Sequence, residues 1–138
     1  MKVHFPDPVY VSVPLEGADF TRRRMLKRIR YFVAPDAAEP IIVPKGFVTD
    51  YASVPRIFWP LLPPWGKYGP AAIVHDYLYT RAGMTVPNPD NPSRMIESDR
   101  KTADKIFLLA MAQLGVGVVK RYVMYFAVRL FGRAAYKN

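Results

Sequence analysis

Proline restricts the possible folds of this chain more than any other residue type does. The 138 residues include 14 prolines, and proline is excluded from helix interiors and central strands because it lacks a backbone N–H and has a fixed φ. Five of the prolines lie between Pro55 and Pro70, together with both tryptophans. We therefore expect this segment to be irregular and to fold over the core, because indole rings are seldom left in water.

The first half of the chain outside that segment predicts short strands. Runs rich in β-branched and aromatic residues, bounded by turn residues, lie at residues 9–13, 29–33, 41–43 and 46–49. A different pattern occupies residues 85–93, which hold three prolines and two asparagines. We expect an exposed loop there, because this composition disfavours helix and strand alike.

The second half predicts three helices. The first begins at Pro70 and ends near Gly83, and the second begins at a Ser98 cap. The third runs from Val118 to Phe131 and ends at Gly132. It is apolar on most sides, so we expect it to lie at the centre of the core.

These elements predict a single α+β domain over residues 1–138. A small antiparallel sheet from the strand-rich part, residues 1–50, packs on about three C-terminal helices in residues 70–132, and the Pro-rich loop 55–70 joins the two parts. A chain of this length can bury one core. It has no cysteine, so disulfides cannot contribute to its stability.

The net charge of +9 is distributed unevenly along the chain. Two clusters hold much of it, one of Arg22, Arg23, Arg24, Lys27, Arg28 and Arg30 and one of Lys120, Arg121, Arg129, Arg133 and Lys137. Such clusters predict a polyanionic partner, such as DNA, an anionic envelope surface or an acidic protein. The alternative is a solvated basic face that only keeps the protein soluble.

Neither a signal peptide nor a transmembrane segment is expected. Prolines follow the N-terminus before any apolar run of useful length. The longest apolar region, residues 106–119, is shorter than the roughly 20 residues that cross a bilayer. We expect it to belong to a buried helical hairpin.

Polar side chains that interrupt apolar segments mark the candidate functional site. Unpaired buried charges are costly, so these groups must pair with one another or with a ligand. The predicted catalytic residues are Asp50, His75, Asp76 and Asp104, and the predicted substrate-binding or anion-binding residues are Ser53, Arg56, Tyr79 and Arg81.

His75 has two possible roles. It could act as a general base or metal ligand oriented by Asp50 or Asp104, or it could donate a structural hydrogen bond to a loop carbonyl. Asp104 is expected to face a semi-buried seam, where Arg56, Arg81 and His75 are its candidate partners. A structural ion pair with arginine is the alternative to a catalytic acid.

A metal site is also possible, with His75, Asp76 and Asp104 as its candidate ligands. One nitrogen ligand among oxygen ligands suits Mg²⁺ or Mn²⁺ better than zinc. The His75-Asp76 pair is similar to part of the metal site of HD phosphohydrolases, but the further histidine of that site has no plausible counterpart here.

Several motifs resemble a family of small phage and prophage proteins, the domain of unknown function 1353 family. They are Thr49-Asp50-Tyr51-Ala52-Ser53-Val54-Pro55-Arg56, His75-Asp76-x-x-Tyr79, Arg81, Ala103-Asp104-x-x-Phe107, Met111 with Gly115-Val116, and Arg121-x-x-Met124-Tyr125 through Val128-Arg129-x-x-Gly132. The resemblance implies a bacteriophage origin, a late-gene or virion-associated setting, and a location in the host cytoplasm or the virion. It implies no particular reaction.

Two functions fit these observations, and whether the protein is an enzyme stays open. We favour an accessory protein of the late virion or lysis stage with a hydrolase-like Asp/His/Asp site, acting on a cell-envelope or nucleotide substrate. The alternative is a non-enzymatic virion or assembly component. Its polar residues would form a structural network, and its basic clusters would contact DNA, the envelope or a virion protein.

Overall fold

The computed structural model describes residues 4–6, 13–14, 23–49, 69–134 and 136. The predicted Pro-rich loop therefore lies outside the described residues, apart from its last two positions. Residues 9–12 of the first predicted strand also lie outside them.

The strands form three small antiparallel units. Their bounds are β1 (Val13–Pro14), β2 (Arg23–Arg24), β3 (Ile29–Tyr31), β4 (Ile41–Val43), β5 (Val48–Thr49), β6 (Thr85–Asn88) and β7 (Asn91–Glu97). The order is β1-β2-β5 in one sheet, while β3 pairs with β4 and β6 pairs with β7. Together with the helices, these units confirm the predicted α+β class.

The pairing of β3 with β4 shows how the alternating pattern builds one side of the core. Ile29 lies opposite Val43 and Tyr31 lies opposite Ile41 in the antiparallel register. All four side chains are buried. Successive side chains of a strand point to opposite faces, so the intervening residues face outward.

The β6–β7 hairpin corrects the expectation of an exposed loop at residues 85–93. Val86 is fully buried opposite Ile96, and the Asn88 side chain accepts a hydrogen bond of 2.9 Å from the Asp90 amide in the turn. The prolines are tolerated because each strand of a two-stranded hairpin has one edge without ladder hydrogen bonds. A register irregularity also follows Pro87.

Three α-helices and a short 3₁₀ turn complete the fold. They are α1 (Gly69–Thr80), α2 (Arg100–Gln113), α3 (Val118–Phe131) and η2 (Gly132–Ala134). The predicted bounds of α3 and its Gly132 end are confirmed. None of the described helices is long and apolar enough to span a membrane.

The N-terminal cap of α2 differs from the prediction. Asp99, and not Ser98, is the cap, and its carboxylate accepts a hydrogen bond of 2.7 Å from the Thr102 amide. Ser98 is buried beside the hairpin, where its amide donates to the Met84 carbonyl. A carboxylate is favoured at this position because it also interacts well with the positive end of the helix dipole.

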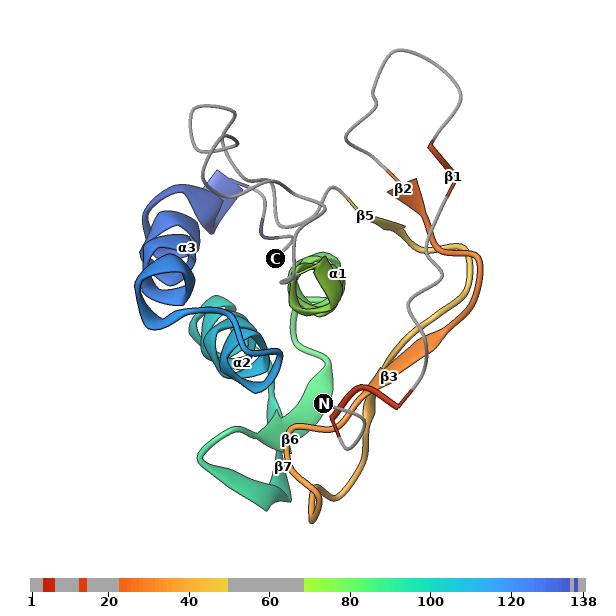
Figure 1. Ribbon diagram of the computed structural model, residues 1–138. Helices are drawn as coiled ribbons and strands as arrows, with labels where there is room; N and C mark the ends of the chain where they lie inside the picture. Colours follow the sequence, from red (N-terminus) through yellow and green to blue (C-terminus); the bar gives the residue numbers. More distant parts are fainter. Residues whose placement is uncertain (1–3, 7–12, 15–22, 50–68, 135, 137–138) are drawn as a thin grey trace.

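α1 lies between the other two helices and the strands (Figure 1), in contact with α2 on one side and with β4 and β5 on the other. Its buried residues cover most of its circumference, among them Ala71, Ile73, Val74 and Leu78. The core therefore surrounds α1.

The prediction that α3 lies at the centre of the core is wrong. α3 packs on α2 at the edge of the molecule (Figure 1), and Met124 and Val128 are its buried residues. Large apolar residues on its other side, such as Phe126 and Leu130, are exposed. α3 thus has more apolar surface than the described part of the chain covers.

Candidate functional site

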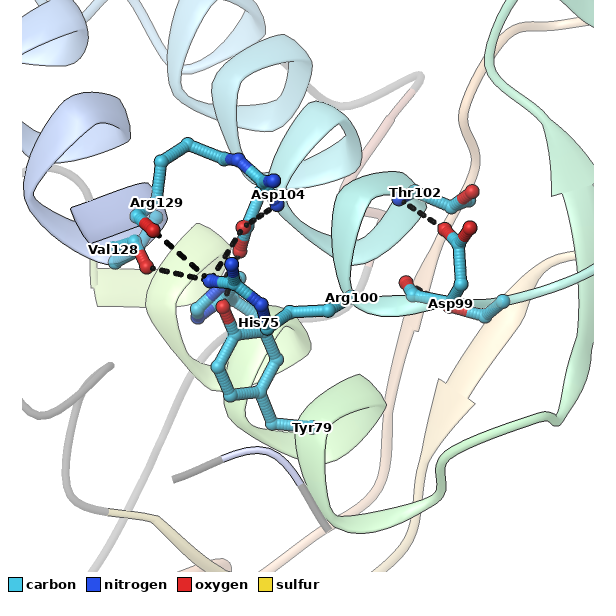
Figure 2. Close-up of polar contacts among 9 residues, drawn as sticks. His75, Tyr79, Asp99, Arg100, Thr102, Asp104, Val128 and Arg129 are labelled. Atoms are coloured by element: carbon cyan, nitrogen blue, oxygen red, sulfur yellow. Dashed lines mark hydrogen bonds and ion pairs between the residues drawn. The ribbon is translucent and has the colours of Figure 1, made fainter. Parts of the chain in front are cut away.

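The candidate site is a cluster of polar side chains at the meeting point of α1, α2 and α3 (Figure 2). At its centre is the Asp104 carboxylate on α2, which is fully buried. His75 Nε2 and the Tyr79 hydroxyl, both from α1, donate to Asp104 Oδ1 over 2.7 and 2.6 Å. Arg129 Nη1, from α3, donates to Oδ2 over 2.7 Å. One carboxylate thus joins three helices, and we call these four residues the Asp104 cluster.

Helical spacing explains how α1 supplies two donors. His75 and Tyr79 are four residues apart, so their side chains lie one above the other on the face turned toward α2. Their rings are in contact, with centroids 4.1 Å apart, and the His75 ring also lies 4.6 Å from that of Phe107. These contacts fix the orientation of the imidazole.

Gly132 allows the end of α3 to approach Tyr79. A Cβ atom at this position would lie 2.7 Å from the Tyr79 hydroxyl oxygen and 3.1 Å from a ring carbon. Such distances are too short for non-bonded atoms, so a side chain here would push the two helices apart. The absence of a side chain at Gly132 therefore leaves room for Tyr79. The close approach also brings Arg129, which lies one turn earlier on α3, within reach of Asp104.

Arg100 supports the cluster from the first turn of α2. Its Nη1 donates to the carbonyls of Val128 and Arg129 in the last turn of α3, over 3.2 and 3.1 Å. The Val128 carbonyl also accepts from the N–H of Gly132 at the end of the helix. The same nitrogen lies 3.8 Å from Asp104 Oδ2. Arg100 thus satisfies the end of α3 and adds positive charge beside the carboxylate.

The electrostatics of the cluster favour an ionised Asp104 and a neutral Tyr79. Burial by itself raises the pKa of the Asp104 carboxyl, but the hydrogen bonds from the surrounding donors outweigh it and bring that pKa below its usual value. Burial and the neighbouring carboxylate raise the pKa of Tyr79 far above its usual range. The hydrogen bond to Asp104 raises the pKa of Arg129 as well. The carboxylate therefore carries its charge with all of its close donors in place.

His75 has one ring nitrogen that the cluster does not use. Its side chain is 1% exposed, and Nδ1 has no hydrogen-bond partner within the described residues. Because the carboxylate accepts from Nε2–H, a neutral ring carries a lone pair on Nδ1. This nitrogen thus offers a lone pair that no described residue uses.

The structure brings three of the predicted site residues together, namely His75, Tyr79 and Asp104. Of the partners expected for Asp104, His75 is confirmed. Arg81 is exposed, with its guanidinium carbon 6.0 Å from the centre of the Tyr77 ring. The predicted catalytic or binding roles of all these residues stay predictions.

The remaining predicted residues are placed less fully. Asp76 follows His75 on α1 and is half-buried. Asp50, Ser53 and Arg56 lie outside the described residues. Their predicted catalytic and anion-binding roles also stay predictions.

A metal centre is not evident in the part of the chain that the structure describes. No group of three or more His, Cys, Asp or Glu side chains is placed there to hold an ion. The candidates His75, Asp76 and Asp104 therefore do not form one by themselves. The two oxygens of Asp104 are already bonded to protein donors.

Sequence reasoning missed Arg129 and Arg100 as partners of Asp104. Its sequence position places Arg129 in the C-terminal basic cluster, but its side chain points inward to the carboxylate. The signal that could have found it is the pair Arg129-x-x-Gly132, a cation and a residue without a side chain one helical turn apart. Arg129 binds Asp104 on α2 and Gly132 makes room for Tyr79 on α1, so both residues serve the meeting point of the three helices.

Residues 24–128 match the model of a family described as a protein of unknown function, DUF1353. The match covers most of the chain, so the chain belongs to this family, and the resemblance seen in its motifs is confirmed. The phage origin stays a prediction. No curated protein and no solved structure matches the chain.

Proposed function

We propose that the protein is a non-enzymatic assembly component, encoded by a bacteriophage or prophage, that binds a partner through the outer side of α3. The observation that carries this proposal is the exposure of large apolar side chains on that side. Val119, Leu130 and Phe131 are 78%, 73% and 64% exposed. Contiguous apolar surface of this kind is typical of interaction sites.

The geometry of the Asp104 cluster supports a structural role for its carboxylate. A catalytic acid or base must come within hydrogen-bonding distance of the reacting group. Asp104 is fully buried, and donors from two neighbouring helices occupy its oxygens. Buried polar networks of this kind can fix the relative positions of helices. The cluster thus supports a rigid scaffold for the outer side of α3.

A second candidate function, a hydrolase-like activity, rests on Nδ1 of His75. The carboxylate orients this ring as it would a general base, and Nδ1 is not used by any described residue. The substrate class expected from the sequence is a cell-envelope polymer or a nucleotide.

The binding proposal is tested by whether the protein is part of assembled particles. In the phage or lysogen that encodes the chain, particles are purified on a density gradient and probed for tagged protein. We expect wild-type protein in the particle fraction and about tenfold less of a Leu130→Glu variant, because a charge on the apolar face prevents its burial.

The matched control is Ile42→Glu. Ile42 is also an exposed apolar residue, 41% exposed on β4, far from α3 in sequence. Its variant should enter particles as wild type does. Absence of the wild-type protein from particles, or equal loss in both variants, would contradict the proposal.

The hydrolase-like alternative has its own test. Purified protein is incubated with peptidoglycan and with nucleoside triphosphates, with and without Mn²⁺, and products are separated by chromatography. Turnover that a folded His75→Gln variant lacks would favour the enzyme and count against the assembly role.

A further inference from the structure

α3 has two apolar faces on opposite sides. Successive residues of a helix are rotated by about 100°, so Met124 and Val128 point to one side while Phe126 and Leu130 point to the other. The first pair is buried against α2, and the second pair is exposed. A helix that is apolar on all sides is normally covered on all sides. The outer face therefore has the composition of a buried surface.

This outer face is hollowed. A depression of about 450 Å³ is lined by residues of α3 alone: Val119, Tyr122, Val123, Phe126, Ala127, Leu130 and Phe131. Ala127 is its small residue, with larger side chains on all sides of it. The lining is apolar except for the Tyr122 hydroxyl, so the depression suits an apolar side chain.

The shape of the depression matches helix packing. Val123, Phe126, Ala127 and Leu130 are spaced i, i+3, i+4 and i+7. Four residues with this spacing form the hole that receives one side chain of a facing helix. From Val119 to Phe131 the face is roughly 18 Å long at 1.5 Å per residue, which is enough for about three turns of a second helix.

The positive charge around the outer face of α3 determines which charge a complementary partner carries. Lys120 and Arg133 are exposed at its two ends, and Arg121 lies 5.8 Å from the Tyr122 ring. The sequence from Lys105 to Asn138 contains no aspartate or glutamate. A partner with acidic residues beside its apolar stripe is therefore complementary.

A second copy of the chain does not meet this requirement. In a two-fold symmetric dimer through this face, each copy presents the same surface to the other. Lys120 and Arg133 of one copy would then approach the same cations of the other, and like charges across an interface oppose association. A bilayer surface is also anionic, but it has no fixed side chain to fill a hollow.

From this combination we infer that the outer face of α3 binds an acidic amphipathic helix of a partner protein, one apolar side chain of which packs into the hollow at Ala127. This inference rests on the proposed assembly function and names the chemistry of the partner. The inference rests on an apolar face, a hole of helical spacing and a positive rim whose Lys120 and Arg133 have no ion pair among the described residues.

The test uses the full chain and a fluorescein-labelled synthetic peptide of three heptads. The peptide has leucine at its a and d positions and glutamate at e and g, and a control peptide has lysine in place of each glutamate. Binding is measured by fluorescence anisotropy. We expect the acidic peptide to bind at least about tenfold more tightly than the basic one.

The decisive variant is Ala127→Leu, which occupies the hole at the small residue of the hollow without adding charge. It should weaken binding of the acidic peptide by about tenfold or more, because an occupied hole cannot receive a side chain. The matched control is Ala112→Leu, the same change at an exposed position of α2. Circular dichroism melting verifies that both variants are folded, and the control should bind as wild type does.

Binding to anionic vesicles of phosphatidylglycerol and phosphatidylcholine distinguishes a helical partner from a membrane surface. A bilayer gains from added apolar surface, so Ala127→Leu would bind vesicles at least as tightly as wild type does. Vesicle binding of this kind, without peptide binding, would overturn the inference. Equal binding of the two peptides, unchanged binding by Ala127→Leu, or a wild-type dimer that Leu130→Glu dissociates would overturn it as well.

The two proposals fail separately. If Leu130→Glu loses its place in particles but the acidic peptide does not bind, the assembly function stands and the partner chemistry is wrong. If neither effect is seen, both proposals are wrong.

Discussion

The Asp104 cluster and the outer face of α3 depart from the usual distribution of residues in opposite ways. The cluster places charge in the interior, and the outer face places large apolar side chains on the surface. The interior charge is explained within the chain, because three donors from two other helices meet the carboxylate. The apolar surface has no such explanation in the described residues. Structure is therefore sufficient to account for the first region, while the second points to a partner.

Removing the carboxylate should have the largest effect on stability. Asp104→Ala leaves His75, Tyr79 and Arg129 without their common acceptor, and breaking a buried ion pair from one side costs about 3–5 kcal/mol. Urea unfolding at pH 7 measures the free energy. The control is Asp90→Ala, whose carboxylate is 71% exposed and pairs with Lys105. Equal stability of the two variants would show that the cluster does not hold the helices together.

Adding a side chain at Gly132, between α3 and α1, should have the next largest effect on stability. In Gly132→Ala the new methyl group meets the Tyr79 hydroxyl at 2.7 Å, and such overpacking typically costs about 1–3 kcal/mol. Gly117→Ala, at the other end of α3, is the control because a Cβ there meets nothing within 4 Å. Thermal melting of both variants compares them. If Gly132→Ala melts at the same temperature as the control, Gly132 is not needed to leave room for Tyr79.

Lowering the pH should reduce the contribution of the Asp104 cluster to stability. The pKa of Asp104 is lowered in the folded state from the unperturbed value of 3.8, so its contribution to stability is complete above that pH and is lost as the pH falls toward the folded pKa. In that window the slope approaches about 1.4 kcal/mol per pH unit for one proton. The difference between wild type and Asp104→Asn isolates this residue. The two unfolding curves should approach each other below pH 4, and parallel curves would contradict the assignment.

Local signals predicted several parts of this structure well. The third helix has its predicted bounds because glycines flank it at both ends, and Gly132 is its cap. The contact of His75 with Asp104 followed from the need of a semi-buried carboxylate for a partner. Such predictions depend on neighbouring residues or on a short set of candidates.

The failures depend on tertiary packing. The hairpin at residues 85–97 departs from the expected loop because prolines disfavour strands in general, although they are tolerated at the edges of this hairpin that have no ladder hydrogen bonds. Arg129 was assigned to a basic surface because its inward orientation depends on how α3 crosses α2. The outer face of α3 was expected inside for the same reason, since an apolar sequence does not say which molecule covers it.

The smallest effect on stability is expected at the outer face of α3. A variant there tests most directly the contrast between this face and the Asp104 cluster. Leu130 is 73% exposed, so Leu130→Glu should change the free energy of unfolding by no more than about 0.5 kcal/mol. Met124→Ala, on the inner side of the same helix, is the reference, because Met124 is 1% exposed and loss of a buried methionine costs about 2–5 kcal/mol. Urea unfolding of the two variants compares the two faces of one helix. A large loss of stability in Leu130→Glu would mean that the chain itself covers this face, and the apolar surface would then belong to the fold and need no partner.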